Sequence, residues 1–309
     1  MRIFLLGKRA SVTGWLEETA AAFRAEGHDV EVGIVRDPRL AAPLQAALAQ
    51  PIAARIAARA RRFEPEIIIA VGGYHVPGAI LERLAAWPER PPLVGWVGDI
   101  FEATAAPLAT YYDLVAFTDS GLLARHRDLG FAAKAVFAPH AIDPASPVPA
   151  RERRIRMVFV ANPTPDRLAA VSAIRSPVVL HGQGWPRIAT HEVHAHRVPP
   201  GKLAGLYAGH LASLNVRNEF NVLTGLNQRH FQPPLAGAPL VSDAQPDLEL
   251  CFEPGREVFV WRDFDELNAI HERILAEPAA ALKVGEAARR RVLAEHSFAH
   301  RLAAIRQAI

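Results

Sequence analysis

Residues 214–243 read LNVRNEFNVLTGLNQRHFQPPLAGAPLVSD, and this segment decides the fold. The apolar residues up to Val216 predict a buried parallel strand, and a second apolar run follows Gly237. Between them, Gly225 permits a tight turn, and a helix is expected to begin near Asn227. The first N–H groups of a helix lack intrahelical partners and favour an anion such as phosphate. The segment therefore predicts a strand–turn–helix–strand unit that holds an anionic ligand.

Similar apolar runs alternate with helical stretches along the whole chain, which is the pattern of parallel sheets with crossover helices. Residues 139–149 contain four prolines in eleven positions and separate two such series, so we interpret them as an interdomain linker. The fold class we expect is α/β, with two Rossmann-like, doubly wound parallel-sheet domains that face each other across a cleft. We predict domains over 1–145 and 146–296, and a final helix over 297–309 that can cross back to the first domain. The predicted strands are 3–6, 30–35, 67–71, 93–97, 114–117 and 135–138, then 155–160, 178–180, 212–216, 239–241 and 258–261.

The composition narrows the function classes. The 309-residue chain has a formal net charge of +3, which does not call for a nucleic-acid partner. A lone cysteine, Cys251, excludes an internal disulfide and a cysteine-based metal cage. We find neither an apolar stretch long enough to span a bilayer nor a secretory signal, so we expect a soluble, cytoplasmic protein.

In open parallel sheets, ligands bind beyond the carboxyl ends of the strands. His75 follows the expected strand 67–71, and Asp99 follows the strand 93–97. Either side chain can position or deprotonate a hydroxyl group, so both are candidate catalytic residues. The alternatives are that His75 is a polar lining residue and that Asp99 caps the next turn.

Two other patterns are weaker. Gly182 and Gly184 form only a fragment of a dinucleotide-binding loop, which argues against a nicotinamide enzyme. His191, His194 and His196 could offer imidazoles to zinc, but on a strand only the last two share a face. We therefore predict no metal site and interpret this segment as an exposed edge or loop.

The second half of the chain resembles the spore-maturation CgeB-like glycosyltransferases, a branch of the group 1 enzymes with the GT-B fold. The first half matches that family only in its layout. The matching residues include VFVAN at 158–162, HGQGW at 181–185, LYA at 206–208, LNVR at 214–217, GLNQRHFQ at 225–232, AGAPLVSD at 236–243 and RRVLAEH at 290–296.

The resemblance implies transfer of a sugar from a nucleoside-diphosphate donor to a hydroxyl acceptor, with retention and without a metal or other cofactor. The acceptor can be a glycan, a protein or a small molecule. The donor would bind in the second domain and the acceptor in the first. The diphosphate would lie near Gly225, with Arg217 and Arg229 meeting its charge and Asn227 bonding a phosphate or sugar hydroxyl. The resemblance places the nucleoside at the loop formed by His181, Gly182, Gly184 and Trp185.

One departure from the family pattern concerns Gln232, where the family usually has a glutamate that binds the ribose hydroxyls. An amide accepts and donates hydrogen bonds but carries no charge. This leaves two alternatives to a glycosyltransferase: a nucleotide-sugar-binding or scaffold protein without turnover, and a sugar-nucleotide epimerase of the same fold.

Overall fold

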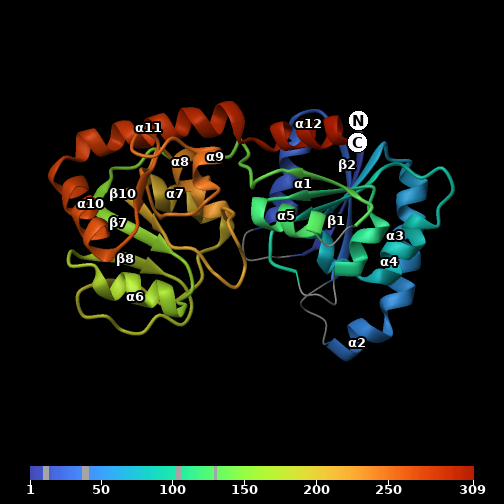
Figure 1. Ribbon diagram of the computed structural model, residues 1–309, viewed down its shortest axis with the longest axis horizontal. Helices are drawn as coiled ribbons and strands as arrows, with labels where there is room; N and C mark the ends of the chain where they lie inside the picture. The colour runs from blue at the N-terminus through green and yellow to red at the C-terminus, as the bar shows by residue number, and fades with distance from the viewer. Residues whose placement is uncertain (10–13, 37–41, 102–105, 129–130) are drawn as a thin grey trace. The chain divides into compact units, whose positions relative to one another are not determined.

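The computed structural model describes residues 1–9, 14–36, 42–101, 106–128 and 131–309 (Figure 1). The chain forms two compact units. Unit 1 contains Met1–Pro139 together with Phe298–Ile309, and unit 2 contains His140–Ser297. The proline-bearing segment from His140 onward therefore belongs to unit 2, where Ile142 is only 2% exposed.

Unit 1 is built on a six-stranded parallel sheet with the order β2-β1-β3-β4-β5-β6. In the sheet, β1 lies between β2 and β3, so the chain extends the sheet first to one side of β1 and then to the other, and the strand order reverses between β1 and β3. The central strands β3, β4 and β5 are buried throughout, as expected for parallel strands covered by helices on both faces. The strands are β1 (Arg2–Lys8), β2 (Asp29–Arg36), β3 (Ile67–Val71), β4 (Leu93–Val97), β5 (Leu114–Phe117) and β6 (Lys134–Phe137).

The last helix of the chain completes unit 1. Phe298 packs edge-on against Trp96, with ring centroids 6.2 Å apart, and Arg301 Nε donates to the carbonyl oxygen of Pro139 at 2.7 Å. The helices of this unit are α1 (Trp15–Ala25), α2 (Ala42–Ala47), α3 (Ala49–Phe63), α4 (Gly78–Ala85), α5 (Ser120–Asp128) and α12 (Phe298–Ala308), with 3-10 turns η1 (Gly73–His75) and η2 (Ala106–Tyr111).

Unit 2 has a second six-stranded parallel sheet, with the order β12-β11-β10-β7-β8-β9. Counted within the unit, this is the 3-2-1-4-5-6 order of the dinucleotide-binding folds, and it reverses between β7 and β10. The strands are β7 (Arg154–Val160), β8 (Val178–His181), β9 (Glu192–His194), β10 (His210–Asn215), β11 (Leu240–Asp243) and β12 (Phe259–Trp261).

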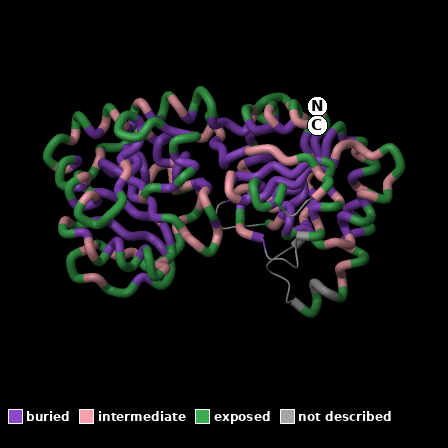
Figure 2. The backbone as a smooth tube through the Cα atoms, in the orientation of Figure 1, coloured by how far each residue is buried: buried purple, intermediate pink, exposed green. Residues whose placement is uncertain are grey.

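Helices cover both faces of this second sheet, and the strands form its buried interior, as Figure 2 shows. Local signals fix several helix starts: the side chain of Thr164 accepts from Arg167 N at the start of α6, and Asp263 does the same for Glu266 N in α10. The helices are α6 (Pro165–Ala173), α7 (Pro200–Ala208), α8 (Gln232–Leu235), α9 (Leu248–Cys251), α10 (Phe264–Ala276) and α11 (Pro278–Glu295), with a 3-10 turn η3 (Gln228–His230).

The two parallel-sheet domains and the eleven predicted strands are confirmed, with ends that differ by up to two residues. The strand β9, a three-residue edge strand of mixed polarity, was not among the predicted strands. The predicted helix from Asn227 to Leu235 is wrong, because the chain there forms the 3-10 turn η3 followed by the four-residue helix α8. No helix within the described ranges combines the length and the apolar character needed to cross a bilayer.

Candidate functional site

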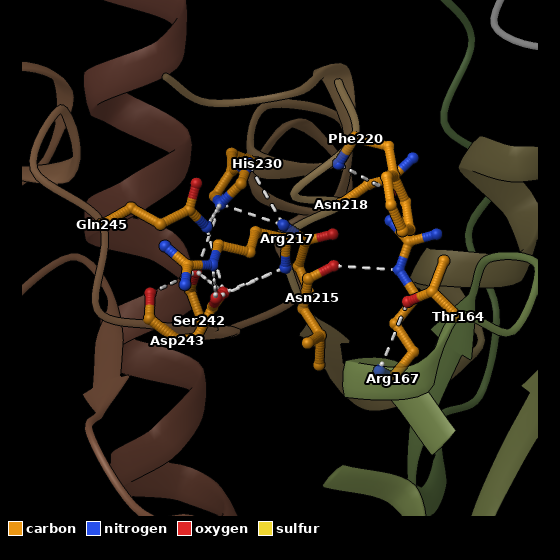
Figure 3. Close-up of polar contacts among 11 residues, drawn as sticks. Thr164, Arg167, Asn215, Arg217, Asn218, Phe220, His230, Ser242, Asp243 and Gln245 are labelled. Carbon is orange, nitrogen blue, oxygen red and sulfur yellow. Dashed lines mark hydrogen bonds and ion pairs between the residues drawn. The ribbon is translucent and has the colours of Figure 1, made fainter. Parts of the chain in front are cut away.

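Polar side chains gather at the carboxyl edge of the unit 2 sheet, at the point where its strand order reverses. Thr164 and Arg167 come from the segment after β7, Asn215 ends β10 and Asp243 ends β11 (Figure 3). β7 and β10 are neighbours whose connections leave in opposite directions, and ligands of such sheets bind beyond the strand ends at this point. Unit 2 therefore has its candidate site at this edge.

Arg167 is a buried cation whose hydrogen-bonding capacity is only partly used. Its side chain is held by two carbonyl oxygens, with Nε 3.1 Å from Val216 O and Nη1 3.1 Å from Asn162 O. Nη2 has no partner within the described residues, although the residue is only 4% exposed. Burial and the neighbouring Arg229 lower the pKa of Arg167 to about 9. A guanidinium with a bare terminal nitrogen in such surroundings is suited to bind an anion.

Arg229 lies partly buried near Arg167 and is oriented by a network on its other side. Its Nε donates to Asn215 Oδ1 at 3.3 Å. The amide nitrogen of Asn215 faces the ring of His230, 2.9 Å from Nε2, which fixes the amide with its oxygen toward the arginine. Burial lowers the pKa of Arg229, and Tyr207 opposes this effect. The arginine is thus held by β10 and carries no carboxylate partner within the described ranges.

His230 is the centre of this network. It is fully buried, and its Nε2 lies 3.1 Å from Ser242 Oγ and 3.2 Å from Gln245 Nε2. Burial lowers the pKa of His230 to about 3, so the ring is neutral at physiological pH and can accept from the surrounding donors. The imidazole joins β10, β11 and η3 and thereby positions Arg229, its neighbour in the chain.

The carboxylates near this edge are already engaged. Asp243 accepts from the backbone N–H of Arg217 at 3.2 Å and from Gln245 Nε2 at 3.0 Å. Burial raises the pKa of Asp243 to about 6 despite these bonds. A hydrogen bond from Asp166 raises the pKa of Glu219, which means that these two carboxyls interact with each other. Asp243 and Glu219 act on Arg167 only through space, and neither makes an ion pair with Arg167 or Arg229 within the described residues.

The predicted diphosphate residues are placed differently from one another. Arg217 is exposed, and its Nε points toward Asp243 Oδ2 at 3.9 Å. Asn227 Oδ1 accepts from Arg229 N at 2.9 Å, so this side chain caps the 3-10 turn from within. Gly225 is buried just before that turn. Gln232 is half-buried, and its amide makes no hydrogen bond within the described residues.

The expectation of free helix N–H groups at Asn227 is wrong. A 3-10 turn of three residues replaces the first turn of the helix, and Asn227 satisfies the N–H of Arg229. The helix that follows has Pro233 and Pro234 in its first turn, and proline has no N–H to donate. The side chains of arginine residues, rather than backbone dipoles, supply the positive charge at this site.

The loop after β8 is fixed against the end of β7. Gly182 and Gly184 adopt φ angles of 154° and 88°, and a Cβ on Gly182 would lie 2.0 Å from Ala161 O. Trp185 is 4% exposed, and its Nε1 donates to the same Ala161 O at 2.6 Å. Trp185 therefore anchors the loop rather than presenting its ring, and the exposed part is the backbone around Gln183 and Gly184.

His181, the last residue of β8, is 8% exposed and stacks on His194 of β9, with ring centroids 4.4 Å apart. Burial lowers the pKa of His181 to about 4. His196 meets the stack edge-on, whereas the ring of His191 turns away and bonds Val171 O at 2.9 Å. In the part of the chain that the structure describes, no group of three His, Cys, Asp or Glu side chains is placed to hold a metal ion.

Unit 1 brings its two predicted residues together at the carboxyl edge of its own sheet. His75 ends the 3-10 turn after β3, and Asp99 follows β4. His75 Nε2 lies 3.9 Å from Asp99 Oδ2, and both side chains are about half exposed. At this distance the two groups form an ion pair when the imidazole is protonated, so the pair can hold a proton at the surface of unit 1.

Sequence reasoning missed Arg167, Tyr207 and Phe220. Arg167 is three residues after a Thr-Pro helix start, but its role depends on the contact of β7 with β10, which lies 49 residues away at Val216. Tyr207 is 1% exposed, and its hydroxyl has no partner within the described residues, near Arg229. Phe220 is 67% exposed in a turn in which its N–H donates to Asn218 Oδ1 at 3.4 Å. The sequence offered only one signal for it, a phenylalanine three residues after Arg217 in a polar segment.

Comparison with solved structures identifies the architecture. Sucrose-phosphate synthase from Thermosynechococcus elongatus superposes with a TM-score of 0.70 at 14% identity, covering 99% of this chain and 98% of that chain. The Anabaena protein HepE, solved in complex with UDP and glucose, gives a TM-score of 0.70 at 14% identity, with 99% and 98% covered. The protein has the GT-B fold. A glycosyltransferase from Rickettsia africae is also similar, with a TM-score of 0.67 at 12% identity and coverage of 99% and 97%.

A family model agrees with this fold assignment. Residues 164–307 match the family described as glycosyl transferase-like, and this range begins at Thr164 and contains the whole cluster around Arg167 and Arg229. No curated protein matches the sequence significantly. The GT-B unit that carries the buried arginines is thus the one with glycosyltransferase-like sequence.

Proposed function

We propose that the protein is a CgeB-like glycosyltransferase that moves a sugar from a nucleoside-diphosphate donor to a hydroxyl acceptor. The observation that carries this proposal is the bare Nη2 of buried Arg167 beside Arg229, at the carboxyl edge where the unit 2 sheet reverses its strand order. Keeping Arg167 charged there is unfavourable without an anion, and a diphosphate offers oxygens to both guanidinium groups.

Leaving-group stabilisation is the main catalytic contribution in this proposal. As the bond between the sugar and the diphosphate breaks, negative charge grows on the diphosphate, and Arg167 and Arg229 are already oriented to offset it. Two fixed guanidinium groups can do this without a divalent metal, so we propose metal-independent transfer, with retention at the anomeric carbon as in the family that the sequence resembles. The sugar class, hexosyl, is part of the same proposal.

The loop at Gly182–Gly184 and the free amide of Gln232 are the proposed contacts of the nucleoside. Gln232 can donate to one ribose hydroxyl and accept from another, although it lacks the charge of a glutamate. The HepE complexes with UDP and with UDP-glucose make uridine the first base to test.

We propose that the His75–Asp99 pair of unit 1 handles the acceptor. The carboxylate of Asp99 would orient His75 so that its ring accepts the hydroxyl proton as the acceptor attacks. Both side chains are exposed enough to meet an acceptor of any size, and the chemistry of the acceptor beyond its hydroxyl group is left open.

The test begins with a thermal-shift panel of uridine, guanosine, adenosine and thymidine diphosphates on the purified protein. A stabilising shift with one base identifies the donor class, and the matching sugar nucleotides are then assayed for release of the diphosphate. Arg229→Gln should abolish both the shift and the release, whereas Arg175→Gln, an exposed arginine of the same unit, should change neither. Absence of a shift with every nucleotide refutes the proposal.

The neutral Gln232 favours one second candidate, a nucleotide-sugar-binding protein without turnover. In that case the nucleotide shift persists, but no sugar nucleotide releases its diphosphate, even with acceptors present. Gln232→Glu tests this second candidate. If the protein lacks turnover only because it has no carboxylate at position 232, the glutamate should strengthen binding of the ribose and start release of the diphosphate.

A further inference from the structure

Unit 2 contains a second polar groove, on the sheet face that α7 partly covers. It has a cavity volume of about 620 Å³, within the range of small-molecule sites. Arg154 and His210, which line it, are the first residues of β7 and β10 and pair in register. Asn215 of the arginine cluster is the last residue of β10, five positions and roughly 17 Å further along the strand. The groove therefore begins at the opposite edge of the sheet and extends along its face to His181.

Two buried imidazoles in its wall, His210 and His181, each have one ring nitrogen without a hydrogen-bond partner within the described residues. His210 is 5% exposed, and its Nδ1 lies 2.8 Å from Leu206 O, so Nδ1 carries the proton and Nε2 is an acceptor. This Nε2 and the Nδ1 of His181 have no partner within the described residues. A buried polar atom without a partner is unfavourable, and a hydroxyl group in the groove would supply the donor that His210 lacks.

The groove also carries positive charge that the protein does not neutralise. Arg151 and Lys202 line it, and neither makes an ion pair within the ranges that the structure describes. Arg154 is paired with Glu192, at 3.1 Å between Nη1 and Oε1. The lining contains one carboxylate, Glu152, among the described side chains. Two cations without ion-pair partners among the described residues, Arg151 and Lys202, therefore face one carboxylate in this lining.

Arg151 lies beside Gly205 of α7 and Gly209, the residue that follows α7. Gly205 and Gly209 are four residues apart and share a helix face. A Cβ on Gly205 would lie 3.4 Å from Arg151 Nε, and one on Gly209 would lie 3.5 Å from Arg151 Cδ. The arginine therefore runs along this helix face within van der Waals distance, and all three residues line the groove.

We propose that this groove is a second binding site, for a small phosphate ester that carries hydroxyl groups. Lys202 and Arg151 bind the phosphate, and the Nε2 of His210 accepts from a hydroxyl. The site is separate from the arginine cluster and stands whether or not the protein transfers sugars. Because His181 lies in its wall and begins the loop that Trp185 anchors, a bound ligand contacts the segment that precedes Gly182–Gly184.

The test uses glycerol 3-phosphate as the probe, with glycerol and inorganic phosphate as the two partial ligands. Imidazole signals of His181 and His210 report on the groove by NMR, and the signal of His230 reports on the arginine cluster. We expect saturable shifts of His181 and His210 with glycerol 3-phosphate, at lower concentration than with inorganic phosphate, and none with glycerol. Lys202→Gln should weaken binding about tenfold, while Lys283→Gln, an exposed lysine of α11, should not change it.

Arg229→Gln distinguishes the two sites, because it should leave the His181 and His210 shifts intact even if every nucleotide response is lost. Shifts that never saturate, that persist in Lys202→Gln, or that occur only at His230 would overturn the groove as a site. Equal affinity for inorganic phosphate and glycerol 3-phosphate would overturn the hydroxyl contact and, with it, the proposed ligand class.

Discussion

Replacement of Arg167 by methionine should separate ligand binding from stability. Burial and Arg229 lower the pKa of Arg167 from 12.5 to about 9, which corresponds to roughly 5 kcal/mol against its charged form. The substitution removes this cost of burying a charge, but it also removes the hydrogen bonds to Val216 O and Asn162 O. Hydrogen bonds from a charged group contribute about 1.5–3 kcal/mol each, so the two effects are similar in size and opposite in sign.

We therefore expect the unliganded Arg167→Met protein to unfold within about 2 kcal/mol of the wild type in urea. Its affinity for the nucleoside diphosphate should fall roughly 10- to 100-fold, because one charge-assisted bond to the ligand is lost. Urea unfolding followed by circular dichroism measures the first quantity, and calorimetric titration measures the second. Arg175→Met, at a 66% exposed side chain, is the control and should alter neither.

The opposite pattern would refute this reasoning. If Arg167→Met lost most of its stability but bound the diphosphate as tightly as the wild type, Arg167 would be a structural residue that ties α6 to β10. The bare Nη2 would then have no role in recognition, and the assignment of the unit 2 edge as an anion site would rest on Arg229 alone.

Three further outcomes follow from particular contacts. Gly182→Ala should lower the free energy of unfolding in urea by at least about 2 kcal/mol, because its Cβ would lie 2.0 Å from a backbone oxygen. Gly201→Ala in α7 is the control, because its Cβ would have no atom within 4 Å, and it should be neutral or stabilising. His271→Leu should stabilise the protein, because both ring nitrogens of this 1% exposed histidine lack partners in the described residues. Burial lowers the pKa of His271 to about 4, so below pH 6.5 the unfolded wild type binds a proton that the folded state does not. The stability advantage of leucine should therefore grow by about 2 kcal/mol from pH 7.5 to pH 5. An advantage that does not change with pH would contradict this. Asp99→Asn should slow transfer to the acceptor by about 10²-fold or more without changing diphosphate affinity, and equal losses in both assays would place Asp99 outside the acceptor chemistry.

The sequence was sufficient to predict the sheets because buried parallel strands are continuous apolar runs, as IIIAV at 67–71 and VVL at 178–180 illustrate. The strand β9 was not predicted, because its three residues, Glu192–His194, lie at the edge of the sheet and form no continuous apolar run. The helix expected to begin near Asn227 is interrupted, because Asn227 caps a 3-10 turn and Pro233 and Pro234, which have no N–H to donate, start the separate short helix α8. Local pattern thus predicts burial well and short irregular turns poorly.

The candidate site was only partly accessible from sequence, because its residues meet through strand order. Arg229 was predicted, but the network of Asn215, His230 and Ser242 that orients it joins two strands and a turn. Arg167 could not be chosen over other arginines until β7 and β10 were known to be neighbours. By contrast, His75 and Asp99 follow consecutive, adjacent strands, so chain order alone indicated their proximity.

The return of α12 to unit 1 has a consequence for protein engineering. Residues 140–297 form one continuous stretch inserted into unit 1, whereas unit 1 is encoded in two pieces. A gene fragment for this stretch can be exchanged as a cassette between homologues, which would move the whole arginine cluster into a constant unit 1. Shortening the chain at its carboxyl end would instead damage the host, because Phe298 and Arg301 contact Trp96 and Pro139.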